Sequence, residues 1–278
     1  MKKLLVTLII FTLAVLSTAC SSSSSSAEAE KSVKVKLGVS GTDHRVWNYV
    51  AKKAEKEGIK VEIVTFSDYV QPNIALAEGE LDANSFQTVS YFDAFIKEHN
   101  LDLVPIATTL IAPMGIYSDK YKEVKDIPKG GKIALANEAT NMGRGLLLLQ
   151  EAGLIKLEED FDGIGSLDKI IENPKNLEFV TVVAGQTPRV MPDVAASIIN
   201  NGIAVDAGLT PKKDALFIES ATATPYINII AVREEDKNNK TLKRLAELYQ
   251  QDDTKEFIDK EYKGNTLPTF VPLSEIGW

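Results

Sequence analysis

Residues 33–66 decide the fold, and they read VKVKLGVSGTDHRVWNYVAKKAEKEGIKVEIVTF. Apolar residues alternate with others over residues 33–39, a period of two that is typical of a β-strand. The turn at 40–43 supplies a helix N-cap, and apolar residues then recur at helical spacing from 46 to 54, before Gly58. Residues 61–66 form a second apolar strand. A strand, a helix and a strand within forty residues predict a parallel pair with a right-handed crossover.

The rest of the chain repeats this alternation of strands and helices. Residues 101–117 are extended and mostly apolar but contain Pro105 and Pro113, which predicts two strands or one bent strand. The pattern predicts strands at 132–136, 177–183 and 226–233 and helices at 72–78, 91–99, 143–152, 193–200, 240–249 and 254–262, with short elements at 202–207 and 215–219. Two successive α/β units and a strong strand that returns late indicate two lobes joined by two crossovers, with hinges near 110–115 and 224–229.

Composition excludes several classes of function. The chain has 278 residues, of which 44% are hydrophobic and 25% charged, as in ordinary globular proteins. Its formal net charge of -8 opposes nucleic-acid binding, which depends on neutralising phosphates. Two histidines and one cysteine cannot form a Cys/His zinc site, a disulfide framework or a Cys-His protease, and no G-x-S-x-G elbow is present. We therefore expect a protein that is not an enzyme and has no metal or cofactor.

The first twenty residues resemble a bacterial lipoprotein signal. Met1-Lys2-Lys3 is positively charged, Leu4–Leu16 is apolar apart from two threonines, and small residues precede Cys20. Such a segment is a secretory signal, and it is too short to span a membrane. We expect a signal peptide over 1–19 and lipid attachment to Cys20. The alternative is an ordinary secretory signal with an incidental cysteine.

A serine run follows the cysteine. Residues 21–26 are all serine, and residues 20–32 as a whole have no apolar periodicity, which predicts a flexible tether. A lipid and a tether would hold the rest of the chain on the extracytoplasmic face of the cell membrane. This arrangement suits the outer face of a Gram-positive cell, and a Gram-negative envelope is the alternative.

The clearest candidate for ligand chemistry is the segment Ala-Thr-Asn-Met-Gly-Arg-Gly at 139–145, which leads from a polar loop into an apolar helix. A helix N-terminus attracts anions, and Arg144 in its first turn offers a planar fork that suits a carboxylate. Gly143 and Gly145 would let a ligand approach the backbone. The alternative is a capped helix whose Arg144 points into solvent.

Two further segments carry aromatic and amide side chains. Tyr69 and Phe86 could form the walls of an apolar pocket, with Asn84 and Gln87 as polar neighbours, although aromatic residues in such turns are more often core. Asn200-Asn201-Gly202 and Pro225-Tyr226-Ile227-Asn228 add amides that more often serve turn geometry. Together, one cation, several amides and aromatic walls would suit a zwitterionic amino acid.

Six segments in order resemble the signature motifs of one family, the methionine-binding lipoproteins of ABC importers, also called NlpA-type lipoproteins. The resemblance runs from about Val33 to Trp278. It is carried by Ser67–Asn73, Leu81–Gln87, Ala139–Gln150, Ile171–Leu177, Ala207–Pro211 and Pro225–Asn228.

This resemblance implies an α/β fold with two lobes, the periplasmic-binding-protein fold of the second type, which closes on its ligand in a cleft between the lobes. Lobe 1 would comprise 33–111 and 229–278, and lobe 2 would comprise 112–228. The implied partners are an amino acid, with methionine first, an ABC permease and its ATPase, and we expect a monomer.

Carried over by motif, Arg144 is similar to the partner of the ligand carboxylate, with Asn141 beside it. Asn200 and Asn228 resemble amide partners of the ligand's amino and carboxylate groups. Tyr69 and Phe86 resemble walls of the pocket for its side chain.

Two departures from the family pattern fall at the side-chain end of this site. Thr88 stands where the family commonly has His, and Gly202-Ile203 stands where many members have an aromatic residue. The resemblance implies L-methionine as the ligand, and these departures leave a related apolar amino acid or a small methionine-containing peptide as alternatives. A surface adhesin with a vestigial pocket is the alternative from another class of function.

Overall fold

The computed structural model describes residues 32–220 and 224–278, which belong to one compact unit. The predicted signal peptide over 1–19, Cys20 and all but the last residue of the predicted tether over 20–32 lie outside the described residues. Within the described ranges, no helix is both long and apolar enough to cross a membrane.

A six-stranded mixed sheet forms the first lobe. Its strand order is β13-β4-β12-β3-β1-β2. Strands β1 and β2 pair in parallel from Val33 opposite Ile59 to Ser40 opposite Phe66, as the opening motif predicts. The strands are β1 (Val33–Ser40), β2 (Ile59–Phe66), β3 (Ala83–Asn84), β4 (Leu103–Ile111), β12 (Ile227–Arg233) and β13 (Leu267–Pro268).

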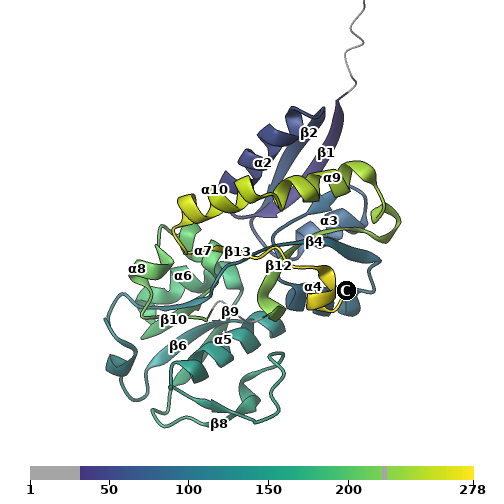
Figure 1. The fold of residues 1–278 in the computed structure, drawn as a ribbon. Helices are drawn as coiled ribbons and strands as arrows, with labels where there is room; N and C mark the ends of the chain where they lie inside the picture. Colours follow the sequence, from purple (N-terminus) through teal and green to yellow (C-terminus); the bar gives the residue numbers. More distant parts are fainter. Residues whose placement is uncertain (1–31, 221–223) are drawn as a thin grey trace, which may run out of the picture. The chain divides into compact units, whose positions relative to one another are not determined.

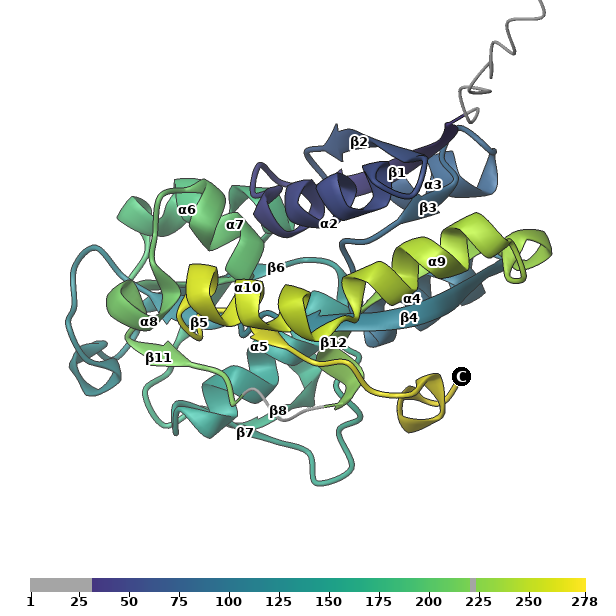
Figure 2. The ribbon, with the colours of Figure 1, turned by 45° about the horizontal axis from the view of Figure 1, so that its top comes forward.

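Helices cover both faces of this sheet (Figures 1 and 2). One core cluster joins the sheet to α2 (Arg45–Glu55), α9 (Lys240–Tyr249) and α10 (Asp252–Tyr262). A second cluster joins it to α3 (Gln71–Ala77) and α4 (Val89–His99). The buried residues of α2, Val46, Trp47, Val50 and Ala54, are the ones that recur at helical spacing in the sequence. Burying this stripe is what makes the segment a helix against the sheet.

A five-stranded sheet forms the second lobe, with strand order β11-β5-β10-β6-β9. The helix α5 (Ala139–Glu151) packs its leucines against this sheet, and α6 (Thr187–Val190), α7 (Asn201–Asp206) and α8 (Pro211–Asp214) complete the lobe. The strands are β5 (Gly115–Tyr117), β6 (Lys132–Ala136), β9 (Glu178–Val182), β10 (Ala196–Ile199) and β11 (Phe217–Ile218), and a separate pair joins β7 (Lys156–Leu157) to β8 (Ile170–Glu172).

The predicted helix over 193–200 is wrong. Residues 191–193 form a short 3-10 turn, and 196–199 form β10, which lies in the middle of the five-stranded sheet. All four residues of β10 are buried, so the segment has no polar alternation to mark it as a strand. A short, fully buried apolar run does not distinguish strand from helix by periodicity.

The chain passes between the two sheets twice. It leaves the first sheet after Ile111 and enters the second at Gly115, and it leaves the second after Ile218 and re-enters the first at Ile227. These crossovers fall close to the predicted hinges. The residue boundaries at 112 and 228 remain predictions, and β12 begins one residue before the second of them.

Candidate functional site

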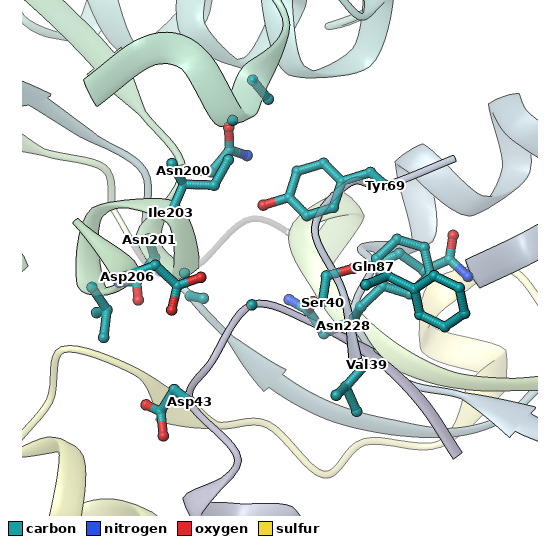
Figure 3. Close-up of a pocket in the computed structure, with 18 of the residues that line it drawn as sticks. Val39, Ser40, Asp43, Tyr69, Gln87, Asn200, Asn201, Ile203, Asp206 and Asn228 are labelled. Carbon is teal, nitrogen blue, oxygen red and sulfur yellow. The ribbon is translucent and has the colours of Figure 1, made fainter. Parts of the chain in front are cut away.

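A pocket of about 800 Å³ is lined by residues from both lobes. All six predicted ligand-binding residues belong to its lining, which are Tyr69, Phe86, Asn141, Arg144, Asn200 and Asn228. In Figure 3, Tyr69 and Asn200 lie on opposite sides of this space, and the Tyr69 hydroxyl points across it. Segments that are up to 159 residues apart in sequence thus contribute to one pocket. The binding of a ligand in this pocket remains a prediction.

Three aromatic rings form one wall of the pocket. The ring centroids of Tyr69 and Phe86 lie 5.9 Å apart, and Tyr91 lies 6.1 Å from Tyr69 and 6.3 Å from Phe86 in edge-on geometry. These separations are typical of favourable aromatic pairs. The wall can therefore contact an apolar side chain, and Tyr91 is a member that the sequence reasoning missed.

Hydrogen bonds to and around the backbone of Tyr69 hold this residue in place. The amides of Val70 and Gln71 both donate to Asp68 Oδ1 over 2.8 Å, and the Tyr91 hydroxyl donates to the Tyr69 carbonyl oxygen over 3.0 Å. Burial and then the negative charge of Glu138 raise the pKa of the Tyr69 hydroxyl. This hydroxyl stays protonated at physiological pH and can donate a hydrogen bond into the pocket.

A closed network of side-chain amides supports the loop that carries Phe86. Asn73 donates to Gln87 over 2.7 Å, Gln87 donates to Asn73 over 2.7 Å and to Asn84 over 3.0 Å, and Asn84 donates to Asn73 over 2.8 Å. All three residues are buried. Asn84 and Gln87, predicted as polar neighbours of the ligand, use their amides on one another and so serve to fix the loop.

Thr88 and Ile203, the two departures from the family pattern, have structural roles. Thr88 is the N-cap of α4, where its hydroxyl accepts from the Tyr91 amide over 3.3 Å. Ile203 lies on α7, lines the pocket and packs against Tyr117 and Ile199. Neither residue adds an aromatic ring, so the aromatic wall consists of residues from the first lobe.

Arg144 lies in the first turns of α5 and is engaged by a carboxylate of the protein. Its Nε donates to Glu219 Oε1 over 2.8 Å, and its Nη2 lies 2.5 Å from Glu219 Oε2 and 3.1 Å from the Ala112 carbonyl oxygen. Both side chains are almost fully buried. The structure therefore excludes the alternative in which Arg144 points into solvent. Nη1 is the Arg144 nitrogen for which the described residues provide no recorded acceptor.

The ion pair touches both crossovers. Ala112 and Met114 belong to the first crossover, and the Met114 amide donates to Glu219 Oε2 over 3.1 Å. Glu219 begins the second crossover, and the Arg144 guanidinium lies 4.3 Å from the ring centre of Tyr226 in the same segment. Arg144 thus links the pocket to the two segments that join the lobes.

Three buried polar atoms of the pocket lining have no hydrogen-bond partner among residues 32–220 and 224–278. Asn200 Nδ2 donates to Asn141 Oδ1 over 2.9 Å, which leaves Asn141 Nδ2 and Asn200 Oδ1 unpaired. Glu138, the N-cap residue of α5, accepts from the Ala184 amide with Oε1, and its Oε2 is unpaired. Buried polar atoms of native proteins are nearly always hydrogen-bonded, so these atoms are the ones left available to a ligand.

The glycines of the 139–145 segment face protein. A Cβ atom at Gly143 would lie 2.0 Å from the carbonyl oxygen of Gly163, and one at Gly145 would lie 2.9 Å from Leu135. Neither glycine belongs to the pocket lining. The prediction that they admit a ligand is wrong, because the close approach is that of a neighbouring loop and of the sheet.

A hydrogen-bonded contact joins the lobes at the rim of the pocket. The backbone amide and the hydroxyl of Thr42, in the loop after β1, donate to Asp206 Oδ1 over 2.9 and 2.6 Å. Asp206 is the last residue of α7, the helix that follows Asn200. This contact opposes separation of the lobes.

The sequence reasoning missed Glu138, Glu219, Tyr91 and the Thr42–Asp206 contact. Glu138 carried a usable signal because it directly precedes the helix of the ligand motif. Glu219 carried none, since it lies 75 residues from Arg144. No group of three or more His, Cys, Asp or Glu residues within 32–220 and 224–278 could hold a metal ion.

Comparisons with known proteins agree with this arrangement. Residues 35–270 match the family described as NlpA lipoprotein. The chain is 41% identical to the uncharacterized lipoprotein YhcJ of Bacillus subtilis over 99% of this chain and 97% of that protein. It is 42% identical to the D-methionine-binding lipoprotein MetQ of Salmonella typhimurium, covering 84% of this chain and 87% of MetQ.

A solved structure shares the fold. A nutrient-binding protein of Burkholderia cenocepacia, solved bound to methionine, superposes with a TM-score of 0.81 at 45% identity, covering 85% of this chain and 100% of that one. The chain therefore has the two-lobed fold of the periplasmic substrate-binding proteins that it resembles. The chain belongs to the NlpA lipoprotein family.

Proposed function

We propose that the protein is a lipid-anchored receptor that binds an α-amino acid with an apolar side chain, L-methionine or a close analogue, and delivers it to an ABC importer. The observation that carries this proposal is the division of the pocket lining between the two lobes. Buried donors and acceptors without partners among the described residues belong to the second lobe, and the wall of three aromatic rings belongs to the first. An α-amino acid has the same division between its charged groups and its side chain.

Relatives named for methionine binding support this ligand, and Thr88 and Ile203 are reasons to test others beside it. The pocket of about 800 Å³ is large enough for methionine, and the alternatives are another apolar amino acid and a methionine-containing dipeptide. Arg144 Nη1 and Asn141 Nδ2 would bind the ligand carboxylate, and Asn200 and Asn228 would add amide contacts.

Calorimetric titration with L-methionine tests this proposal. Residues 27–278 are unfolded and refolded to remove any co-purified ligand and are then titrated. Saturable binding with a Kd of low micromolar or below is expected. Ligand at a hundredfold excess over Kd should raise the free energy of unfolding by about 2.7 kcal/mol.

A matched pair of variants tests whether methionine binds in this pocket. Asn228 lines the pocket, and among the described residues its side chain makes one long hydrogen bond, of 3.5 Å, to the Tyr226 carbonyl oxygen. Asn238 lies on the surface, where it accepts from Lys243. Asn228→Ala should weaken methionine binding by about tenfold, and Asn238→Ala should leave it unchanged. No heat with methionine, other apolar amino acids or methionyl dipeptides would leave the adhesin alternative instead.

The lipid anchor is tested separately. Labelled palmitate should be incorporated into the full-length protein in a bacterial host and should be absent from Cys20→Ser. The variant should appear in the soluble extracytoplasmic fraction. A variant that stays with the membrane would contradict anchoring through this residue.

A further inference from the structure

Glu138 differs from the other acidic side chains of the pocket lining because one of its oxygens is buried and has no hydrogen-bond partner among the described residues. Asp43 is paired with Arg45 over 2.6 and 2.8 Å, and Asp206 accepts from Thr42. Asp68, the remaining acidic residue of the lining, caps the backbone of α3. No basic side chain of the described residues lies within salt-bridge distance of Glu138. Its Oε2 is a buried, uncompensated acceptor at the pocket.

Neither cation of the described pocket lining, Arg144 or Arg189, forms an ion pair with this oxygen. Arg144 is neutralised by Glu219, with which it makes two hydrogen bonds in a buried pair. A buried carboxylate oxygen without a hydrogen bond is costly, so a ligand that brings a positively charged donor gains the most from it. The polar end of the pocket therefore selects for a cation as well as for a carboxylate.

The neighbouring amides reinforce this polarity. When two side-chain amides are joined by one hydrogen bond, one NH₂ group and one carbonyl oxygen always remain free to bind another molecule. Asn141 and Asn200 are joined in this way. The remaining acceptor can join Glu138 Oε2 on the ligand's ammonium group. The remaining donor can join Arg144 Nη1 on its carboxylate.

We propose that Glu138 binds the α-ammonium group of the ligand and thereby restricts this receptor to molecules with a free, charged amine. This inference rests on the proposed function and adds the residue that sets its substrate class. Methionine without its amino group would place a methylene group against Glu138 Oε2 and leave that oxygen without a hydrogen bond. Such an analogue is rejected even though its carboxylate and side chain fit.

The test compares L-methionine with 4-(methylthio)butanoate, which lacks only the amino group, on the wild type and on Glu138→Gln. Gln keeps the acceptor for the Ala184 amide and replaces Oε2 by an NH₂ group. We expect Glu138→Gln to weaken methionine binding by about 10- to 100-fold. Binding of the deaminated analogue should stay within about threefold or improve, so the ratio of the two Kd values falls.

Two further variants separate charge from shape. Glu138→Asp keeps the charge and should retain a preference for methionine. Glu178→Gln removes an exposed carboxylate on β9, outside the pocket, and should change neither affinity. Melting temperatures of all variants, measured without ligand, establish that each is folded.

Each outcome bears on one claim. If Glu138→Gln binds methionine as the wild type does, or loses affinity for both compounds equally, Glu138 does not bind the ammonium group and the inference fails. If the wild type binds none of the amino acids or methionyl dipeptides, the proposed function fails instead. If the wild type binds methionine and its analogue equally well, the receptor does not require an amine, and the inference fails while the receptor function stands.

Discussion

Replacing Arg144 by methionine should lower the free energy of unfolding more than any surface substitution does. The change removes a guanidinium that is 5% exposed and leaves Glu219, 7% exposed in its side chain, with one recorded donor, the Met114 amide at 3.1 Å. Removing one partner of a buried ion pair costs about 3–5 kcal/mol, because the other charge stays buried without compensation. For a body of this size, that loss lowers Tm by roughly 6–20 °C.

A double-mutant cycle identifies the cause of this loss. Glu219→Met should cost a similar amount, because it leaves Arg144 buried with the Ala112 carbonyl as its recorded acceptor. The double variant should lie within about 2 kcal/mol of the wild type, since apolar side chains of similar length can replace a buried pair at little cost. Urea unfolding followed by circular dichroism measures all four proteins and should give a coupling energy of about 3 kcal/mol or more.

A second ion pair provides the control. Arg244 and Glu57 make the same two-point contact, over 2.7 and 2.8 Å, but are exposed on the surface. Arg244→Met should therefore change Tm far less than Arg144→Met does. The reasoning is refuted if the two single losses at Arg144 and Glu219 add without coupling, or if Arg244→Met is as damaging as Arg144→Met.

Three further results are expected. Asp206→Asn should weaken the contact with Thr42 between the lobes and raise the rate of ligand release about fivefold in stopped-flow fluorescence, with little change in Tm. Gly143→Ala should lower the free energy of unfolding by about 1–3 kcal/mol in urea titration, because its Cβ atom collides with the Gly163 carbonyl. Burial raises the pKa of Tyr226 to about 12 and that of five other tyrosines further, so stability should fall as pH rises above about 10, where the unfolded chain loses its phenolic protons first. Absorbance at 295 nm and circular dichroism should then change together.

The two substitutions each have a matched comparison. Glu62→Gln breaks a surface ion pair with Lys34 inside one lobe and should not alter ligand release. Gly202→Ala has no atom within 4 Å of the new Cβ and should be tolerated. Unchanged release in Asp206→Asn, a stable Gly143→Ala, or tyrosines that all ionise near pH 10 while the fold persists would contradict the respective argument.

The sequence predicted the opening strand, helix and strand because their apolar periods are long and uninterrupted. It failed at 193–200, where Ala196 to Ile199 are all buried and the period that marks a strand is absent. Length was the remaining signal, since a run of four buried residues suits a strand better than a helix.

The candidate site was predicted in part for a similar reason. Local motifs brought Tyr69, Asn141 and Arg144 forward because each lies in a turn or at a helix start with an unusual composition. The acceptor of Arg144 could not be found in this way, because Glu219 is placed by the folding of two crossovers. Asn84 and Gln87 fix the loop that carries Phe86 through hydrogen bonds inside a buried network, and the spacing of residues in the sequence does not reveal these contacts.

Because the Arg144–Glu219 pair contacts both crossovers, Arg144 and the aromatic wall of the pocket differ in how readily they can be substituted during evolution. A substitution at Arg144 alters the link to the two crossovers, the folding and, under the proposed function, the contact with the ligand at once, and selection can rarely accept three changes in one step. The aromatic wall of Tyr69, Phe86 and Tyr91 has no such link, so its members can be exchanged singly. If the proposed function holds, new specificities in descendants of this protein should therefore arise among ligands that share the same backbone atoms and differ in their side chains.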